Sequence, residues 1–347
     1  MSRKNIALFI FCALMVFSTQ AWASRARVMV LGTGDPMGLL NGGSLLFEDE
    51  YNLFYNPSYI NDQKNWAVIE KSNYNNATGS TTAMGGFAAK IHGLNMGLFL
   101  NRIEELASGA TTGMNYANIN NMRPIELYLG NDTGIKWGAG VQYASFTNAT
   151  QTNSDITLRA GIQHQAFEPF AWLKLSGSEE TSTPTIKHSS VGGGLRYRYG
   201  EWTPYAGIRQ DEIAQGTVSV KSATLGLGAT RNTKLSESTR MVYGLGFFRK
   251  TQNSRNIMPV DFSVEADAAS WVTVRGGLSY HLLDRVNGVT QADSTTGRLG
   301  ASFHFGKADL NWAVGGGGVA ETATSMDSQA FDFGNGIFTA VSIAYRW

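Results

Sequence analysis

The chain has 347 residues, of which 16% are charged, with a formal net charge of +1, 40 glycines and 7 prolines. A charge balance this close to zero lacks the basic excess that attracts nucleic acid. The one cysteine, Cys12, leaves no disulfide to form, so nucleic-acid binding and thiol chemistry are not expected.

Residues 1–23 have the layout of a secretory signal peptide. A positively charged start precedes an almost wholly apolar run over residues 6–17, and Ala21-Trp22-Ala23 is a small-x-small cleavage motif. The apolar run is too short for a stable transmembrane helix. We expect the mature chain to begin at Ser24, without a cysteine, and losing the two basic residues of the signal changes its net charge to −1.

The stretch after the signal, RVMVLGTGDPMG over residues 27–38, has the look of a nucleotide-binding turn. Gly32, Gly34 and Gly38 follow a short apolar run, as in a dinucleotide fold. That fold needs a strand, a turn and a helix in one unit, and Pro36 falls where the helix would begin its first turn. Nicotinamide cofactors are also not held outside the cytoplasm. We therefore set the dehydrogenase interpretation aside.

The longer segment, residues 24–60, carries a different pattern. Its glycine-rich stretch is followed by Glu48-Asp49 and by the run Phe54-Tyr55-Asn56-Pro57, with Ser58 after it. It resembles the N-terminal segment of the FadL-like long-chain fatty-acid transporters and the PorV-type barrels, which usually have Ala where this chain has Ser58. The resemblance implies that residues 24–62 fold into a barrel lumen as a plug, with Asn56 and Pro57 as its motif. A simple structural tether is the alternative.

From residue 63 onward, segments of about ten residues alternate between two faces, which is the period of a β-strand. In residues 135–143, Ile, Trp, Ala, Val and Tyr share one face, and Lys, Gly, Gly and Gln share the other. Tyrosine and tryptophan gather near the segment ends, as in the aromatic girdles of transmembrane barrels. An exported chain without apolar helices can cross a membrane only as a closed barrel.

We therefore predict an all-β fold: a transmembrane antiparallel barrel formed by residues 63–347. Short turns alternate with longer polar loops, the longest being 104–122 and 318–335, which is typical of outer-membrane barrels. Sixteen strands fit the pattern, and merging a weak pair would give fourteen. The predicted strands are 64–72, 81–91, 94–103, 123–130, 134–146, 154–164, 167–176, 188–199, 202–210, 217–230, 239–250, 258–267, 270–282, 295–305, 308–317 and 336–347.

The last strand ends on Tyr345-Arg346-Trp347. This ending resembles the C-terminal signal that the barrel-assembly machinery reads, with Tyr345 and Trp347 as its aromatic positions. The expected location is the outer membrane of a Gram-negative bacterium. The expected partners are outer-membrane lipid, lipopolysaccharide and the assembly machinery, whereas the oligomeric state stays open between a monomer and a homo-oligomer.

Charged residues recur on the faces predicted to point inward. They either create a transverse field in a water-filled pore or pair across a filled lumen and stiffen the wall. The predicted pore-lining residues are Lys136, Arg159, Arg196, Arg198, Arg209, Asp261, Glu265, Asp267, Arg275 and Arg298.

No constellation for catalysis stands out. The five histidines lack metal-ligand spacing. Two Ser–His pairs, Ser279 with His281 and Ser302 with His304, share inward faces, but such pairs arise by chance where a lumen is lined with polar residues. We expect no enzyme, no metal and no cofactor.

Three functions remain. The first is a porin-like channel for passive diffusion of small polar solutes, supported by the polar, glycine-rich inward faces. The second is a FadL-like transporter of hydrophobic compounds, supported by the Asn56-Pro57 segment. The third is a non-conducting structural or scaffold barrel that works through its long loops. A lumen sealed by residues 24–62 favours the second or the third.

Overall fold

The computed structural model describes residues 24–40, 42–63, 65–72, 82–102, 124–147, 152–180, 185–291, 295–316 and 337–347. The predicted signal peptide and the predicted loops 104–122 and 318–335 lie outside these residues. Across the described ranges, no helix has the length and apolar character needed to cross a membrane.

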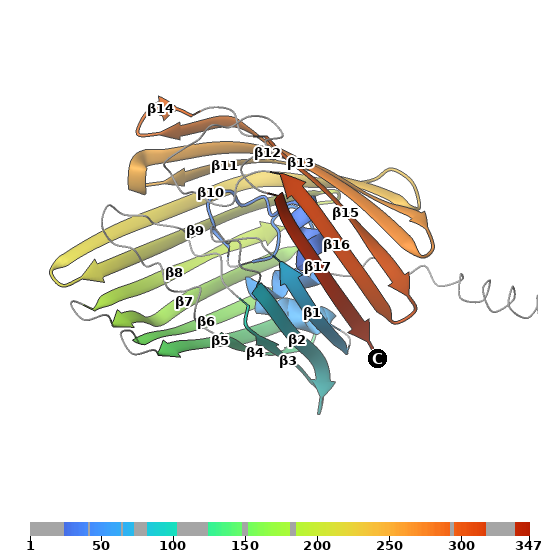
Figure 1. Ribbon diagram of the computed structural model, residues 1–347, viewed down its shortest axis with the longest axis horizontal. Helices are drawn as coiled ribbons and strands as arrows, with labels where there is room; N and C mark the ends of the chain where they lie inside the picture. The colour runs from blue at the N-terminus through green and yellow to red at the C-terminus, as the bar shows by residue number, and fades with distance from the viewer. Residues whose placement is uncertain are drawn as a thin grey trace, which may run out of the picture.

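Sixteen long strands form one closed antiparallel sheet in the described part of the chain (Figure 1). The sheet closes where β1 pairs with β17, with Trp66 opposite Arg346 and Ser72 opposite Ala340. The strands are β1 (Trp66–Ser72), β2 (Thr82–Ile91), β3 (Leu94–Leu100), β4 (Ile125–Asp132), β5 (Lys136–Thr147), β6 (Thr152–Gln163), β7 (Phe167–Glu180), β8 (Ile186–Tyr197), β9 (Trp202–Gln215), β10 (Val218–Lys234), β11 (Thr239–Lys250), β12 (Arg255–Ala269), β13 (Val272–Val286), β15 (Thr295–Phe305), β16 (Ala308–Gly316) and β17 (Ile337–Arg346). Two small elements, the 3-10 turn η4 (Gln252–Ser254) and the two-residue strand β14 (Val289–Thr290), lie in the connections on either side of β12 and β13.

The predicted fold class is confirmed, with sixteen strands rather than fourteen. Both ends of β11 and of β15 agree with the predicted segments, whereas β9 continues to Gln215, five residues past its predicted end. A strand needs about 9–11 residues to span the membrane, and β9 has 14. Past that length the outward face does not have to be apolar, so Glu212 interrupts the apolar face without ending the strand.

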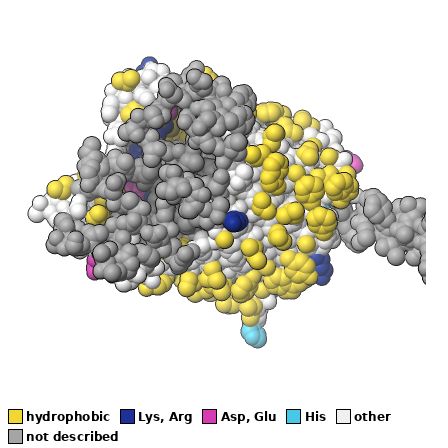
Figure 2. Space-filling model, in the orientation of Figure 1, with side chains coloured by type: hydrophobic (Ala, Val, Ile, Leu, Met, Phe, Trp, Pro, Cys, Tyr) yellow, Lys and Arg dark blue, Asp and Glu magenta, His cyan; other side chains and the backbone are white. Residues whose placement is uncertain are grey.

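The outward face of the barrel is apolar, as lipid requires. Phe87 on β2, Leu127 on β4 and Leu158 on β6 all have exposed side chains, and the same holds for apolar residues on the later strands through Ile343. Figure 2 shows hydrophobic side chains spread over the surface where β1, β16 and β17 lie in Figure 1.

Tight turns join the strands at one end of the barrel. His92 and Gly93 between β2 and β3 both have positive φ, at 49° and 86°, and Gly306 between β15 and β16 has φ 67°. Glycine adopts this left-handed conformation without the steric penalty of a Cβ atom. We refer to this end as the turn end of the barrel.

The chain before β1 lies inside the barrel and carries three short helical elements. These are α2 (Arg25–Leu31), η1 (Glu50–Phe54) and η2 (Pro57–Asp62), drawn in blue within the ring of strands in Figure 1. Pro36 lies in a non-helical turn after α2, so the glycine stretch forms no strand–turn–helix unit.

Candidate functional site

The candidate site is the lumen, which the N-terminal part of the chain occupies from one wall to the other. We call residues 24–62, apart from residue 41, the luminal segment. All seven residues of α2 are buried, and α2 contacts strands β12, β13, β15, β16 and β17, whereas η2 contacts β3, β4, β5 and β6. The segment therefore bridges opposite sides of the barrel.

Each helical element of the luminal segment begins at a side-chain cap. Ser24 Oγ accepts a hydrogen bond from the Arg27 N–H at 3.1 Å, and Asp49 Oδ1 accepts one from the Tyr51 N–H at 2.8 Å. Asn56 caps η2 in the same way, with Pro57 as its first residue. The predicted Asn56-Pro57 motif thus separates η1 from η2 and starts the second of them.

Inward-facing glycines of the wall provide the surface on which the luminal segment rests. A Cβ atom added to Gly277 would lie 2.0 Å from the Val30 carbonyl oxygen, and one added to Gly138 would lie 2.1 Å from the Pro57 carbonyl oxygen. At Gly161 the clash would be with Asn56 Oδ1, at 1.8 Å. These glycines bring the backbone of the segment into direct contact with the strands. The glycine-rich inward faces are therefore contact surfaces for the segment.

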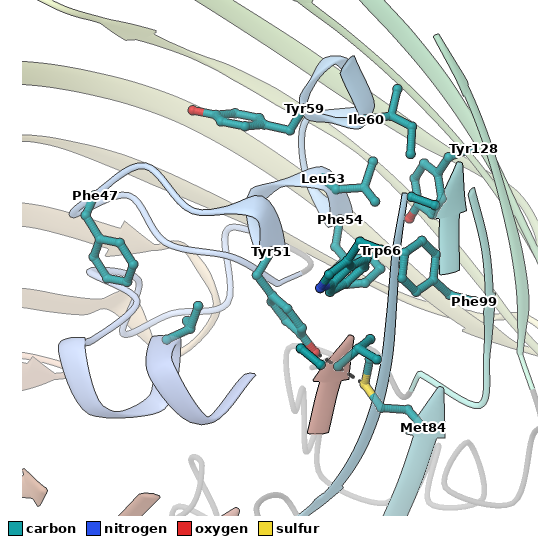
Figure 3. Packing of buried hydrophobic residues seen from close by; sticks show 14 of the residues in the cluster. Phe47, Tyr51, Leu53, Phe54, Tyr59, Ile60, Trp66, Met84, Phe99 and Tyr128 are labelled. Carbon is teal, nitrogen blue, oxygen red and sulfur yellow. Dashed lines mark hydrogen bonds between the residues drawn. The ribbon is translucent and has the colours of Figure 1, made fainter. Parts of the chain in front are cut away.

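An aromatic cluster packs η1 against the wall near β1 to β4 (Figure 3). Phe54 meets Tyr51 edge-on, with ring centroids 4.6 Å apart, and meets Phe99 at 5.1 Å. Trp66 lies 5.7 Å from Phe99, and the Tyr51 hydroxyl donates to Met84 Sδ at 3.3 Å. Aromatic pairs of this geometry contribute about 0.5–1.5 kcal/mol each beyond the area they bury.

A buried ion-pair cluster holds α2. Arg27 Nε lies 2.8 Å from Glu265 Oε2 on β12, and the same guanidinium pairs with Asp49. Glu265 also pairs with Arg275 on β13 and lies 2.9 Å from Arg240 Nε. Glu265 and Arg275, both predicted to face inward, are thus brought together. Arg27 of the luminal segment pairs with Glu265 on the wall and with Asp49 of its own segment.

A second polar cluster joins η2 to the opposite wall. The Arg196 guanidinium, fully buried on β8, donates to the Tyr59 hydroxyl at 2.8 Å, to the Tyr55 hydroxyl at 3.1 Å and to Glu168 Oε2 at 2.9 Å. Arg198 spans Glu168 Oε1 at 2.9 Å and Glu48 Oε1 at 3.1 Å. Because two carboxylates, Glu168 and Glu48, face the two arginines, the charges are balanced within this cluster.

The other predicted pore-lining residues are also held by neighbours. Lys136 pairs with Asp62 of the luminal segment. Arg209 lies 2.8 Å from Asp211 and donates to the Gly38 carbonyl at 2.7 Å. Arg159 donates to Gln142 at 2.7 Å. Asp267, which is exposed near the turn end, accepts from Thr273 at 2.6 Å, and Asp261 interacts electrostatically with Arg298.

The tyrosines of the luminal segment lie out of contact with water. Burial raises the pKa of the Tyr51, Tyr55 and Tyr59 phenols, and the positive charge of Arg196 partly opposes this for Tyr55 and Tyr59. Nothing in the alternation of the strands predicted these positions, because they belong to the irregular segment. The only sequence feature that pointed to these buried tyrosines was the run of aromatic residues before Asn56-Pro57.

The two Ser–His pairs are not brought together for catalysis. His304 Nδ1 lies 2.6 Å from Asp309 and its Nε2 lies 2.9 Å from the Thr273 hydroxyl, whereas the Ser302 hydroxyl interacts with Arg275 and Asn311. His281 faces Asp284 at 3.6 Å. Within the described residues, His, Cys, Asp and Glu side chains form no cluster that could hold a metal ion.

Comparison with known proteins identifies the fold. No family model matches the chain, and no curated protein matches it in sequence. A bacterial polysaccharide outer membrane secretin is similar in structure, with a TM-score of 0.54 at 8% identity over 82% of this chain and 99% of the secretin. Two further similar structures are an anion-selective porin from Comamonas acidovorans (TM-score 0.43, 13% identity, 82% of this chain and 98% of the porin) and CdiB from Acinetobacter baumannii (TM-score 0.47, 12% identity, 81% of this chain and 59% of CdiB). The chain therefore has the fold of an outer-membrane β-barrel, and the resemblance to FadL-like and PorV-type proteins rests on residues 24–60 alone.

Proposed function

We propose that this protein is an outer-membrane channel barrel that its own luminal segment holds closed, and that passes small polar solutes when the segment shifts. The observation that carries the proposal is the bridging position of the segment, which is buried between β12–β17 on one side and β3–β6 on the other. An open diffusion pore would leave this cross-section to water. We therefore propose a gated channel in place of the open porin-like channel that the sequence predicted.

The inward wall supports a polar solute over a hydrophobic one. Its charged side chains lie on at least six strands, from β4 to β13. The apolar luminal side chains of the described residues, such as Trp66, Phe99 and Tyr128, pack against the luminal segment. Once the segment moves, the middle strands present these charged side chains and glycines to a solute, beside aromatic residues such as Phe170, Trp172 and Tyr205. The charged groups suit hydrated solutes.

A non-conducting scaffold barrel is the second candidate. The compensated ion pairs around Arg27 and Arg196 favour it, because breaking a buried pair costs about 3–5 kcal/mol. The FadL-like alternative is kept for the case in which hydrophobic ligands, and not polar solutes, move the segment.

Single-channel conductance in planar bilayers tests the proposal. We expect the mature protein to be silent or to open in brief events, and a variant lacking residues 24–62 to give stable open steps. Stable large steps from the mature protein would exclude the closing role. Silence from both proteins, each shown to be folded, would leave the scaffold function. Openings triggered only by added fatty acid would favour the hydrophobic alternative.

A further inference from the structure

The start of α2 lies beside an incompletely bonded carboxylate. The Arg25 N–H donates to Glu70 Oε1 at 2.6 Å, and Ser24, which caps the helix, is buried. Glu70 is 3% exposed on the inward face of β1, and its second oxygen, Oε2, has no hydrogen-bond partner among the described residues. The Arg25 side chain acts on Glu70 electrostatically, and the Tyr51 hydroxyl also interacts with this carboxylate. A buried carboxylate oxygen without a partner is costly, so its position calls for a donor.

A second buried polar group, a serine hydroxyl, lies next to Glu70. Ser342 on β17 is the direct neighbour of Glu70 across the β1–β17 closure, and its buried hydroxyl also has no partner within the part of the chain that the structure describes. Ala26 packs with Ala313 and Ala340, and Ala340 is on the same face of β17 as Ser342. The first turn of α2 therefore lies beside both Glu70 and Ser342. The Ser24 nitrogen is one residue from the Arg25 nitrogen, and consecutive Cα atoms lie only about 3.8 Å apart along the chain.

We infer that cleavage of the signal peptide after Ala23 creates the missing donor: an α-ammonium group on Ser24 that pairs with Glu70 and locks the luminal segment in place. A signal peptidase hydrolyses the Ala23–Ser24 amide with one water molecule. The Ala23 carbonyl leaves as a carboxylate, and the Ser24 nitrogen becomes an ammonium. An uncleaved chain offers one neutral N–H at this place, whereas the cleaved chain offers three N–H donors and a positive charge.

This inference rests on the proposed function, in which the luminal segment closes the barrel. It adds that signal-peptide cleavage controls this closure. The barrel closes firmly only when the chain has been processed at the correct bond, because an end that is one residue longer carries its charge away from Glu70. Ser24 and Glu70 then hold the luminal segment in the closed position. The ammonium group that joins them is created by signal-peptide cleavage during export.

The test compares refolded proteins that begin at Ser24 with proteins that carry one added glycine before it. Both contain Val28→Cys as a reporter, since the mature chain has no other cysteine and Val28 is a residue of α2 that is buried when the segment is seated. We expect a water-soluble maleimide to label the reporter at least tenfold faster in the glycine-extended protein. Glu70→Gln should raise the rate of the Ser24 protein to that level and leave the extended protein unchanged. The matched control, Glu212→Gln on the exposed end of β9, should change neither rate.

Equal labelling of the Ser24 and glycine-extended proteins would overturn the inference. If both are slow, the segment is seated without help from the ammonium and the proposed function is unaffected. If both are as fast as the unfolded chain although the barrel is folded, the segment is not seated and the proposed function fails as well. Heat-modifiable gel mobility identifies the folded barrel in each sample.

Discussion

At the residue scale, the inward glycines decide whether the lumen is open or filled. Gly277 and Gly276 are adjacent on β13 and differ in what surrounds them. A Cβ atom on Gly277 would be 2.0 Å from the Val30 carbonyl oxygen, whereas on Gly276 the nearest atom would be a Leu299 methyl carbon at 3.7 Å. Neither glycine has a positive φ, so alanine fits the strand backbone at both positions. Because successive residues of a strand point to opposite faces, Gly277 faces α2 in the lumen and Gly276 faces outward.

We therefore expect Gly277→Ala to displace α2 and Gly276→Ala to have little effect. Overpacking of this kind costs about 1–3 kcal/mol, which loosens the luminal segment without opening the sheet. The measurement is single-channel recording, in which the Gly277→Ala protein should open more often than the mature protein. Identical recordings from the two variants would mean that α2 does not rest on this glycine when the barrel is in a membrane.

At the scale of elements, η1 and η2 place three tyrosines in dry surroundings. Burial raises the pKa of Tyr51, Tyr55 and Tyr59 above the ordinary value of about 10. The folded state therefore holds these phenol protons more tightly than the unfolded state does. Their contribution to stability is fully present below about pH 10 and is lost as the pH rises above it, because the unfolded chain ionises first.

We expect the folded protein at about pH 11 to show no phenolate absorbance from Tyr55 or Tyr59. The variants Tyr55→Phe and Tyr59→Phe should then have the same ultraviolet phenolate signal as the parent while folded. Once unfolded, each variant should lose the signal of one tyrosine. A loss of signal in the folded variants would show that η2 is exposed to water and that the lumen is not filled at this point.

The sequence predicted the elements of the wall better than the elements of the lumen. Period-two alternation located every long strand because lipid outside and polar surroundings inside impose opposite demands on neighbouring residues. The luminal segment has no such period, so its fold was predicted only through a resemblance. Glu265 and Arg275 could be placed on the inward face, but their shared partner Arg27 could not be, since no pattern links a residue at the start of the chain to β12.

At the scale of the whole molecule, the wall closes on itself without help from the segment that fills it. The β1–β17 pairing extends over seven residue pairs, from Trp66–Arg346 to Ser72–Ala340, and every long strand has two neighbours in the sheet. These backbone hydrogen bonds are internal to the sheet and persist in lipid whether or not the lumen is filled. The luminal segment adds side-chain packing and ion pairs, which are a separate contribution to stability.

Removal of residues 24–62 should therefore leave a folded barrel that melts at a lower temperature. Trp66, Phe99 and Tyr128 would lose apolar partners and face water, while Glu265 would keep Arg275 on the neighbouring strand. We expect the truncated protein to retain heat-modifiable gel mobility and to lose it several degrees below the full mature chain. A truncated protein that never shows the folded band would mean that the segment is needed to build the wall, and its silence in a bilayer would then say nothing about the channel.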